Sequence, residues 1–443
     1  MIKEKQNILV TGGLGFIGYN VVVRLMNLGH KISIVDNKTT YGSLPQDELD
    51  YLHKERFFSI ANRVTDSNDL NIYTIDIANP DLDQLFKAEQ FDAVIHLASF
   101  PRQKIVNDNP IDGSKAMSEG LLNILERSRA NNVKRFTYIS SSMVYGDFMD
   151  NVTEDAVCNP IGQYAIMKYA GELLVKDYTR QYDLKHTIIR PSAVYGPVDV
   201  DDRVISKFML SALQDKPIRV FGKMEKLDFT FVNDVANGIV DATLSPNGEN
   251  ETYNLTRSKG VTLYDAARAV SLTVGKGNID VKNRDMNYPT RGTLSIKKAQ
   301  EHFHFNPIVD IEEGIKIYYN WLSNSTYWQE KINPKPKPET YPEVTSVTPS
   351  EVTPVTKRVL AKANKEMPKE NAKPKTKAPV KANAIIKAPA KAKAPAKAKA
   401  PAKAKAPAKA KAPAKAKAPV KAKAPVKAKT KPKTKAKAKP KKK

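Results

Sequence analysis

The sequence contains a single cysteine, Cys158, among 443 residues. A lone cysteine has no partner within the chain, which excludes a disulfide-bonded scaffold and suits a reducing compartment. Long hydrophobic runs are also absent, because no stretch of about 20 apolar residues occurs that would span a membrane. The first residues pass from charged side chains into a strand-like segment, without the apolar core of a secretory signal. We therefore expect a cytoplasmic protein without a membrane span.

The sequence also has few histidines, cysteines or acids at the spacings that bind metal ions. Of the six histidines, His302 and His304 form one His-x-His pair, and no cluster of acids or cysteines accompanies it. We therefore expect no metal site.

The charge is distributed unevenly along the chain. Lys and Arg number 72 against 47 Asp and Glu, a net charge of +25. Residues 334–443 hold 34 of the basic residues and five of the acids, a net +29, which leaves −4 for residues 1–333. The basic excess belongs to the last quarter, and the rest of the chain is slightly acidic and apolar enough to fold.

The last quarter divides into two segments of biased composition. Residues 333–356 are rich in Pro, Thr and Glu without an apolar period, which is typical of an extended linker. Residues 357–443 are mainly Lys, Ala and Pro, with a proline every six residues from Pro389 to Pro425. Regular prolines prevent a continuous helix and dense like charge opposes collapse, so we predict a disordered basic tail.

The partner of this tail is expected to be a polyanion. Residues 357–443 carry 32 Lys and Arg against two acids, a composition that binds DNA, RNA or other polyanions in a strongly salt-dependent way. They include no aromatic residue for base stacking, which argues against direct base readout. The composition is similar to that of linker-histone tails and leaves the nucleus open as a location. The alternative is a solubilising appendage with no specific partner.

Residues 1–190 alternate short β-branched runs with longer amphipathic segments. Helices are expected at 113–131 and 163–182, and strands at 7–11, 31–36, 71–77, 92–98, 135–141 and 185–190. Nearly all-apolar strands separated by helices are typical of a parallel sheet covered on both faces. We predict a doubly wound α/β fold. Residues 37–70 are longer and more polar than an ordinary crossover, and we expect an insertion there with a helix at 47–58.

After Arg190 the pattern becomes a mixture of loops, short strands and helices. The helices are expected at 204–215, 234–244, 263–274, 294–302 and 311–321. We predict that residues 191–332 form a smaller α/β substrate-binding region, interleaved with the first domain.

A glycine-rich turn follows the first strand, in the segment ILVTGGLGFIG. Gly12, Gly15 and Gly18 permit a sharp turn, close approach of the backbone to a pyrophosphate, and a helix N-terminus facing that charge. Asp36 ends the next strand, 18 residues after Gly18, where a carboxylate accepts hydrogen bonds from ribose hydroxyls and repels a 2′-phosphate. This favours a Rossmann-type domain that binds NAD over NADP. Asp76 after the third strand is either an adenine contact or a cap.

Further motifs complete a resemblance to a known family. YAIMK contains Tyr164 and Lys168, and ISSSMVYG begins at the end of the fifth strand and includes Ser141. HLAS lies at the end of the fourth strand, and RPSAVYGP begins at the end of the sixth. Together with TGGLGFIG, these motifs resemble the extended short-chain dehydrogenase/reductase superfamily, within it the nucleotide-sugar epimerase/dehydratase branch, over about residues 5–325. The resemblance implies cofactor contacts from Tyr164, Lys168, Phe16, Ile17, Asn37, Asp76, Ile77, Leu97 and Ala98. Members of this branch commonly form dimers through two helices of the first domain.

The catalytic residue types also make chemical sense. An unperturbed tyrosine is a poor base at neutral pH, but Lys168 one helical turn from Tyr164 places a positive charge on the same face. That charge, together with the charge of the nicotinamide, favours the phenolate. Tyr164 is then expected to remove a hydroxyl proton while hydride leaves the same carbon for NAD⁺. Ser141 is expected to donate a hydrogen bond to the substrate oxygen.

The identity of the reaction follows from the residues after Ser141. Dehydratases of the branch have Asp-Glu there, whereas this chain has Ser142 and Met143, and a thioether cannot exchange a proton. Dehydration is therefore disfavoured. We predict a nucleotide-sugar epimerase that oxidises and re-reduces one sugar hydroxyl, most often at C4 of a UDP-sugar, with NAD recycled.

Recognition of the substrate departs from the family pattern at two positions. Leu227 stands where the family has an Arg that contacts the nucleotide diphosphate, and Ala193 stands where an Asn is common. The resemblance assigns substrate contacts to Ser141, Ser142 and Arg291, with Arg203 or Lys223 as candidate helpers.

Three alternatives stay open at this point. A net dehydrogenase, resembling the 3β-hydroxysteroid type, has the same catalytic residues but releases NADH. A sugar-nucleotide dehydratase is disfavoured by Met143. The third alternative is a polyanion-binding protein whose folded part is a retained NAD-binding scaffold. The sequence does not identify the sugar, the nucleotide or the inverted carbon.

Overall fold

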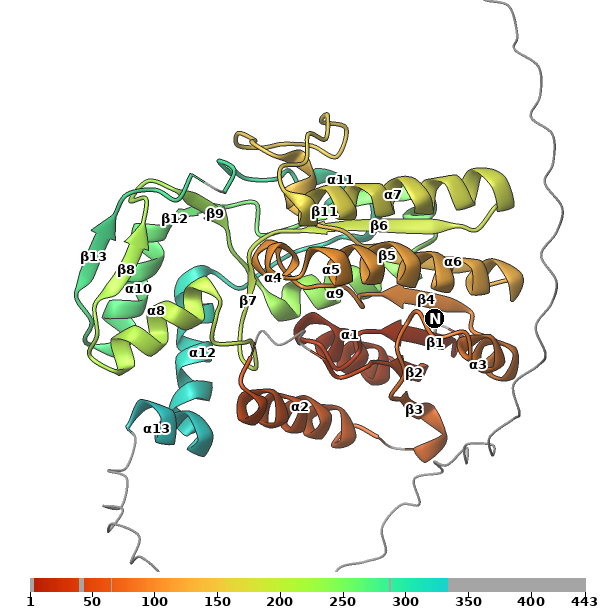
Figure 1. Ribbon diagram of the computed structural model, residues 1–443, viewed down its shortest axis with the longest axis horizontal. Coiled ribbons are helices and arrows are strands. Elements are labelled where there is room, and N and C mark those ends of the chain that lie inside the picture. Colours follow the sequence, from red (N-terminus) through yellow and green to blue (C-terminus); the bar gives the residue numbers. More distant parts are fainter. Residues whose placement is uncertain (1–3, 40–43, 65, 287, 334–443) are drawn as a thin grey trace, which may run out of the picture. The chain divides into compact units, whose positions relative to one another are not determined.

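Figure 1 shows a computed structural model of the chain. It describes residues 4–39, 44–64, 66–286 and 288–333. All of these belong to one unit, Met1–Thr345. The predicted basic tail and the predicted linker beyond its first residue lie outside the described residues.

A seven-stranded parallel sheet forms the centre of the fold. Its strands lie in the order β11 (Glu251–Leu255), β6 (His186–Pro191), β5 (Arg135–Ile139), β4 (Ala93–His96), β1 (Asn7–Thr11), β2 (Lys31–Val35) and β3 (Leu70–Tyr73). The chain winds from β1 to β3 in one direction and then crosses to β4 on the other side of β1. Ligands of such sheets bind at this switch point, beyond the carboxyl ends of the strands. The predicted Rossmann-type α/β fold is confirmed.

Helices cover both faces of the sheet (Figure 1). One face packs against α1 (Phe16–Asn27) and α9 (Val232–Leu244), and the other against α3 (Leu82–Glu89), α6 (Leu121–Ala130) and α7 (Gln163–Tyr182). Every residue of β4, β5 and β6 is buried as a result. Burial on both faces explains why their apolar residues do not alternate with exposed ones, and it also encloses polar residues such as Arg135 and Arg190.

The segment from residue 191 onward forms a second apolar core. It contains the helices α8 (Val204–Leu213), α10 (Leu263–Val274), α12 (Ile311–Asn324) and α13 (Thr326–Ile332), whereas α11 (Lys297–Phe303) packs on β11. Three two-stranded sheets accompany these helices, formed by β7 (Val194–Tyr195) with β10 (Thr230–Phe231), β8 (Ile218–Phe221) with β13 (Ile279–Lys282), and β9 (Lys226–Asp228) with β12 (Gly260–Thr262).

Several elements differ from the sequence expectation. Strand β11 was not predicted, because its residues Thr252 and Asn254 are buried polar groups that break any apolar run. The helix expected at 113–131 is divided into α5 (Pro110–Lys115), a π-helical turn (Ala116–Gly120) and α6. Gly120 ends the turn, where an added Cβ would lie 2.5 Å from the Ile77 Cδ1 atom.

Helix α4 (Gln103–Asp108) was not predicted. The insertion after β2 forms helix α2 (Gln46–Ala61), which is slightly longer than predicted. Helix α2 lies beside α13 in Figure 1. The Tyr51 and Ser325 hydroxyls are 2.8 Å apart, and the Lys331 ammonium donates to the buried Glu48 carboxylate at 3.0 Å. The insertion is therefore fixed to the last described helix.

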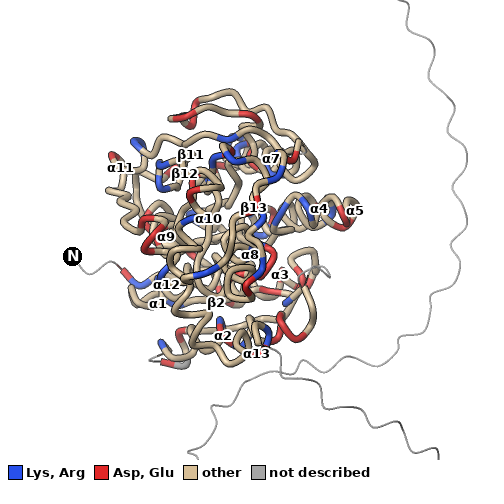
Figure 2. The backbone as a smooth tube through the Cα atoms, turned by 90° about the vertical axis from the view of Figure 1, so that its left-hand side faces the viewer, with Lys and Arg blue, Asp and Glu red and all other residues tan. Residues whose placement is uncertain are grey.

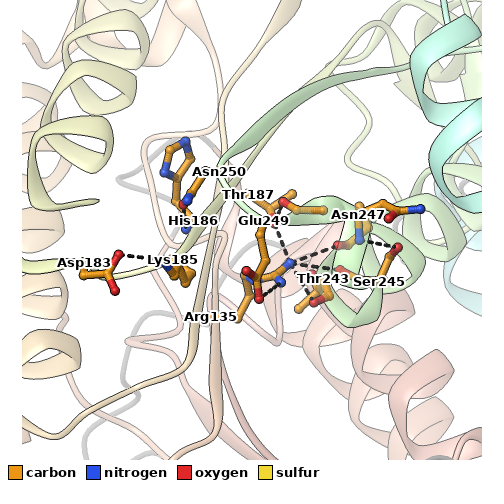
Figure 3. Close-up of polar contacts among 12 residues, drawn as sticks. Arg135, Asp183, Lys185, His186, Thr187, Thr243, Ser245, Asn247, Glu249 and Asn250 are labelled. Atoms are coloured by element: carbon orange, nitrogen blue, oxygen red, sulfur yellow. Dashed lines mark hydrogen bonds and ion pairs between the residues drawn. The ribbon is translucent and has the colours of Figure 1, made fainter. Parts of the chain in front are cut away.

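Arg135 anchors the end of α9 to the first residue of β5 (Figure 3). Its buried guanidinium donates to the carbonyl oxygens of Thr243 and Ser245, both at 3.3 Å, and pairs with Glu249 at 3.1 Å. A cation at a helix C-terminus satisfies carbonyl groups that have no partner within the helix. This contact places the segment that leads into β11.

Acidic and basic residues are interspersed over the described elements (Figure 2). Among these residues, no helix is long and apolar enough to cross a membrane. The described part of the chain also contains no group of three or more His, Cys, Asp or Glu arranged to hold a metal ion.

Candidate active site

The glycine-rich turn joins β1 to α1 with very little space around it. Gly12 has φ +70°, and an added Cβ would lie 2.7 Å from the Ala98 backbone nitrogen. At Gly18 a Cβ would overlap the Gly12 carbonyl oxygen, and at Gly15 it would lie 3.1 Å from that oxygen. These glycines therefore allow β1, the end of β4 and the first turn of α1 to pack against one another.

The first turn of α1 is suited to an anion. Gly15 is the N-cap residue, and within the described residues no side chain caps this turn and no acid lies in it. Phe16 is buried and Ile17 packs against the core behind the turn. Free backbone N–H groups at a helix N-terminus bind phosphate groups. The turn therefore fits the pyrophosphate of a dinucleotide.

Asp36 lies directly beside this turn. Its two carboxylate oxygens accept hydrogen bonds from the backbone N–H groups of Leu14 (3.0 Å) and Lys38 (2.8 Å). The carboxylate is thereby held at the end of β2, where a ribose would lie. This position agrees with the role predicted for Asp36, and the contact with Leu14 was not anticipated from the sequence.

Asp76 and Asn37 hold each other at the neighbouring strand end. The Asn37 amide donates to the Asp76 carboxylate at 2.8 Å, and the Ala78 backbone N–H donates to its other oxygen at 2.8 Å. Asp76 thus caps a turn, one of the two roles left open by the sequence. Ile77 is buried against Gly120 beneath this turn.

The end of β4 completes the dinucleotide side of the site. Leu97 donates its backbone N–H to the Thr11 carbonyl at 3.0 Å, which places Ala98 against Gly12. His96 lies 2.9 Å from the Thr11 hydroxyl. Burial, reinforced by the charge of Lys168, lowers the pKa of His96 to about 3, so this imidazole is neutral at physiological pH.

The predicted catalytic residues meet at the carboxyl end of β5. Helix α7 places Tyr164 and Lys168 one turn apart, with the Lys168 ammonium 6.0 Å from the centre of the Tyr164 ring. Ser141 follows β5, and its hydroxyl is hydrogen-bonded to Tyr164. Lys168 is buried and donates to the Ile139 carbonyl at 2.7 Å. All three predicted catalytic residues are therefore together.

Burial dominates the electrostatics of this group. It raises the pKa of Tyr164, against the lowering effects of the Ser141 hydrogen bond and the Arg203 charge. Burial also lowers the pKa of Lys168 to about 7, although the Glu172 carboxylate opposes this shift. The phenolate is expected to be favoured by the lysine charge together with that of the bound nicotinamide. In the protein without cofactor, Tyr164 instead holds its proton more firmly than a free tyrosine.

A buried ion pair supports the catalytic helix and was missed by the sequence argument. Arg190 in β6 donates to both carboxylate oxygens of Glu172 in α7, at 2.9 and 2.6 Å. The Ser140 hydroxyl also donates to Glu172, at 2.5 Å. Burial opposes the charge of Arg190, but the Glu172 carboxylate outweighs it and raises the pKa of Arg190. Glu172 follows Lys168 by one helical turn, and this spacing could have indicated from the sequence that the two side chains interact.

The predicted substrate side adjoins Ser141. Ser142 and Met143 begin the short turn after β5 and are buried. The Arg291 guanidinium lies 3.8 Å from the Met143 sulfur, because Gly292 and Phe148 form a backbone hydrogen bond that brings the two segments together. Burial lowers the pKa of Arg291 to about 10, opposed by Tyr288 and Glu225. In the part of the chain that the structure describes, no carboxylate forms an ion pair with Arg291.

The two candidate helpers occupy different places. Arg203 is the N-cap residue of α8, and its charge lowers the pKa of Tyr164. Lys223 lies at the β8–β9 turn, with its ammonium 4.8 Å from the centre of the Tyr264 ring. Leu227, which replaces the family's Arg, is buried in the second core.

Known proteins resemble this chain over the described region. Residues 8–256 match the model of the NAD dependent epimerase/dehydratase family. A UDP-glucuronate 4-epimerase from Thermodesulfobacterium geofontis is 31% identical over 321 residues, which cover 71% of this chain and 95% of that protein. A putative UDP-glucose 4-epimerase from Methanocaldococcus jannaschii is 29% identical, with 72% and 99% covered.

Solved structures show the same similarity. The UDP-glucuronic acid 4-epimerase of Bacillus cereus, in complex with UDP-glucuronic acid and NAD, superposes with a TM-score of 0.65 at 26% identity, covering 71% of this chain and 98% of that chain. The UDP-glucose 4-epimerase of Thermotoga maritima, with UDP-glucose, gives a TM-score of 0.63 at 27% identity, covering 72% and 98%.

Proposed function

The chain belongs to the NAD-dependent epimerase/dehydratase family, and we propose that it is an epimerase that inverts C4 of a UDP-sugar. NAD is the cofactor of this family, and the glycine turn, the uncapped start of α1 and Asp36 fit it. When bound, NAD accepts and returns the hydride. The relatives named for 4-epimerisation of UDP-sugars support the reaction and the substrate class.

The observation that carries the proposal is the contact of Ser141 with Tyr164 beside Lys168. Tyr164 takes the proton of the sugar hydroxyl, and Ser141 donates a hydrogen bond to the same oxygen. The proton passes back from Tyr164 when the carbonyl is reduced on its opposite face. Because burial raises the pKa of Tyr164, this step depends on positive charge at the site. Arg203 lowers this pKa, and the Lys168 ammonium lies 6.0 Å from the ring centre.

Met143 separates this reaction from dehydration. Elimination of water from a sugar needs an acid and a base beside the reacting carbons. The residues that follow Ser141 are a hydroxyl and a thioether, and the Met143 side chain packs on Arg291. Arg291 offers a half-buried positive charge for the substrate diphosphate. Both features favour epimerisation of a nucleotide-activated sugar.

The test is direct turnover by the full chain. UDP-glucose, UDP-glucuronic acid and UDP-N-acetylglucosamine are each followed by NMR while absorbance at 340 nm is recorded. We expect inversion at C4 of at least one sugar without net NADH. Accumulation of NADH equal to product would instead indicate a dehydrogenase. Tyr164→Phe should abolish turnover, whereas Tyr182→Phe, the same change at an exposed position of α7, should not.

We also propose that the chain forms a homodimer through α6 and α7. Leu122 on α6 and Ile166 and Leu173 on α7 are large apolar side chains that are 38%, 51% and 52% exposed. The two helices pack against each other, and Ile166 and Leu173, seven residues apart, lie on the same side of α7. Ile166→Glu should yield monomers in analytical ultracentrifugation. Leu272→Glu, at an exposed position on α10, should leave the dimer intact.

For residues 357–443 we propose binding to nucleic acid or another polyanion. Their 32 basic residues and two acids support this, and the folded part carries about −4. The full chain should bind duplex DNA of mixed sequence with an affinity that falls steeply with salt. A chain that ends at Asn333 should not bind it. Equal DNA affinity of the two chains at low salt would refute this role.

A further inference from the structure

Helix α2 buries a cation that the mechanism does not use. The Arg56 side chain is on the face of α2 turned toward the glycine-rich loop, and the residue is 4% exposed. Its guanidinium donates to the Leu14 carbonyl at 3.2 Å and to the Val198 carbonyl at 2.9 Å. Leu14 lies within the glycine-rich loop, and Val198 lies in the loop that leads from β7 to α8. The Arg56 side chain therefore joins the glycine-rich loop to the loop that leads from β7 to α8.

The peptide groups of Leu14 are held from two sides. Its N–H donates to the Asp36 carboxylate at 3.0 Å, and its C=O accepts from Arg56. The conformation of the glycine-rich loop thus depends on an acid at the end of β2 and a base from the insertion. Glycines give this loop little conformational preference of its own, so such external contacts matter for its shape.

Burial of the Arg56 guanidinium costs desolvation free energy, which a purely structural role would not require. Burial lowers its pKa, and although Asp199 and Asp36 oppose this effect, no carboxylate of the described residues forms an ion pair with it. A buried guanidinium is expensive unless it is paired, whereas an apolar side chain would fill the same space without that cost. Its two carbonyl partners are therefore the reason for an arginine at this position.

The second loop is held by α2 at two points. Besides the Arg56 contact with Val198, the buried Glu48 carboxylate accepts the Asp201 backbone N–H at 3.1 Å. Val198 has φ +65°, a conformation that β-branched residues rarely adopt and that surrounding contacts must impose. The loop ends at Arg203, the residue whose charge acts on Tyr164.

We propose that Arg56 is a positioning residue that sets the affinity for NAD, because it holds the glycine-rich loop at Leu14 and the 198–203 loop at Val198 in one fixed relation. The proposal rests on the family's NAD cofactor and is independent of which sugar is the substrate. Loss of the guanidinium releases both carbonyl groups. NAD affinity falls, and the KM for the sugar nucleotide rises with it.

The test uses the full chain, stripped of nucleotide, with Arg56→Gln and Arg56→Lys. Arg63→Gln is the matched control, because Arg63 is an exposed arginine just beyond the end of the same helix. NAD binding is measured by calorimetry, thermal unfolding without NAD reports folding, and hydrogen exchange follows residues 12–18 and 196–203. Kinetics with the sugar nucleotide separate KM from kcat.

Arg56→Gln should weaken NAD binding about tenfold or more, as expected for hydrogen bonds from a charged donor. Arg56→Lys should lie between this variant and the wild type, because an ammonium reaches one carbonyl. Both variants should accelerate exchange in both loops, and Arg63→Gln should change neither property. The KM for the sugar nucleotide should rise more than kcat falls.

Folded Arg56 variants with the NAD affinity of the wild type would overturn the proposal, as would faster exchange confined to α2. If Arg56→Gln does not fold, the NAD affinity and the hydrogen exchange of Arg56→Lys test the proposal in its place. A protein that binds NAD as expected but turns over no UDP-sugar would refute the proposed function and leave this inference standing, so the two failures are distinguishable.

Discussion

Replacement of Gly18 by alanine is a sharp test of the dinucleotide site. Gly18 is the third residue of α1, where alanine alone would be favoured over glycine by about 1 kcal/mol in a helix. The added Cβ would overlap the Gly12 carbonyl oxygen and lie 2.9 Å from the Gly12 carbonyl carbon and the Gly13 Cα atom. Ordinary carbon–carbon contacts are about 3.5–4.0 Å, so the turn must open by roughly 0.6–1.1 Å.

This displacement acts directly on the backbone that faces the pyrophosphate. We expect Gly18→Ala to weaken NAD binding by about 100-fold, or about 2.8 kcal/mol at 1.4 kcal/mol per factor of ten. Calorimetry with nucleotide-free protein measures the change. Gly113→Ala in α5 is the control, because its Cβ would meet the Val106 side chain at 3.2 Å and no backbone. NAD affinity within threefold of the wild type in folded Gly18→Ala would refute the reasoning.

Three further predictions concern charge and pH. Burial lowers the pKa of His186 to about 4, so the unfolded chain takes up a proton below its ordinary pKa of 6.5 that the folded chain does not. The contribution of neutral His186 to the free energy of unfolding is therefore present above pH 6.5 and lost as the pH falls. In urea titrations, the wild type should lose about 2 kcal/mol of this free energy between pH 6.5 and 5, and His186→Gln should not. Glu172→Gln removes the carboxylate that raises the pKa of Lys168, so that pKa should fall below about 7. The alkaline limb of the pH–rate profile, where Lys168 loses its proton, should therefore move to lower pH. Arg291→Met should raise the KM for the sugar nucleotide about tenfold or more, as for loss of a charged hydrogen-bond donor, whereas Lys223→Met should leave it within about twofold.

Local sequence patterns were sufficient for much of the site. The glycine turn and Asp36 lie within one strand–helix–strand unit, and Tyr164 and Lys168 lie on one helix whose bounds, Gln163–Tyr182, were predicted. Each of these arrangements is determined by spacing along a single element or between neighbours. The apolar strands were recognisable for the same reason, because burial on both faces leaves a continuous signal in the sequence.

Features that depend on distant contacts were not predictable. Strand β11 joins the sheet through buried polar residues such as Asn254, which accepts a hydrogen bond from the Tyr145 hydroxyl 109 positions earlier. Arg56 meets Val198 across 142 positions, and no periodic pattern links them. The raised pKa of Tyr164 in the protein without cofactor was not predictable either, because burial of its hydroxyl is a property of the packed molecule.

The central claim is that hydride leaves and returns to the same carbon within one active site. The measurement is turnover by the full chain of its UDP-sugar carrying deuterium at C4, analysed by NMR and mass spectrometry. The account predicts that the 4-epimer keeps deuterium at C4 and that no NADH accumulates. Deuterium recovered in released NADH, or exchanged for solvent hydrogen at C4, would contradict it.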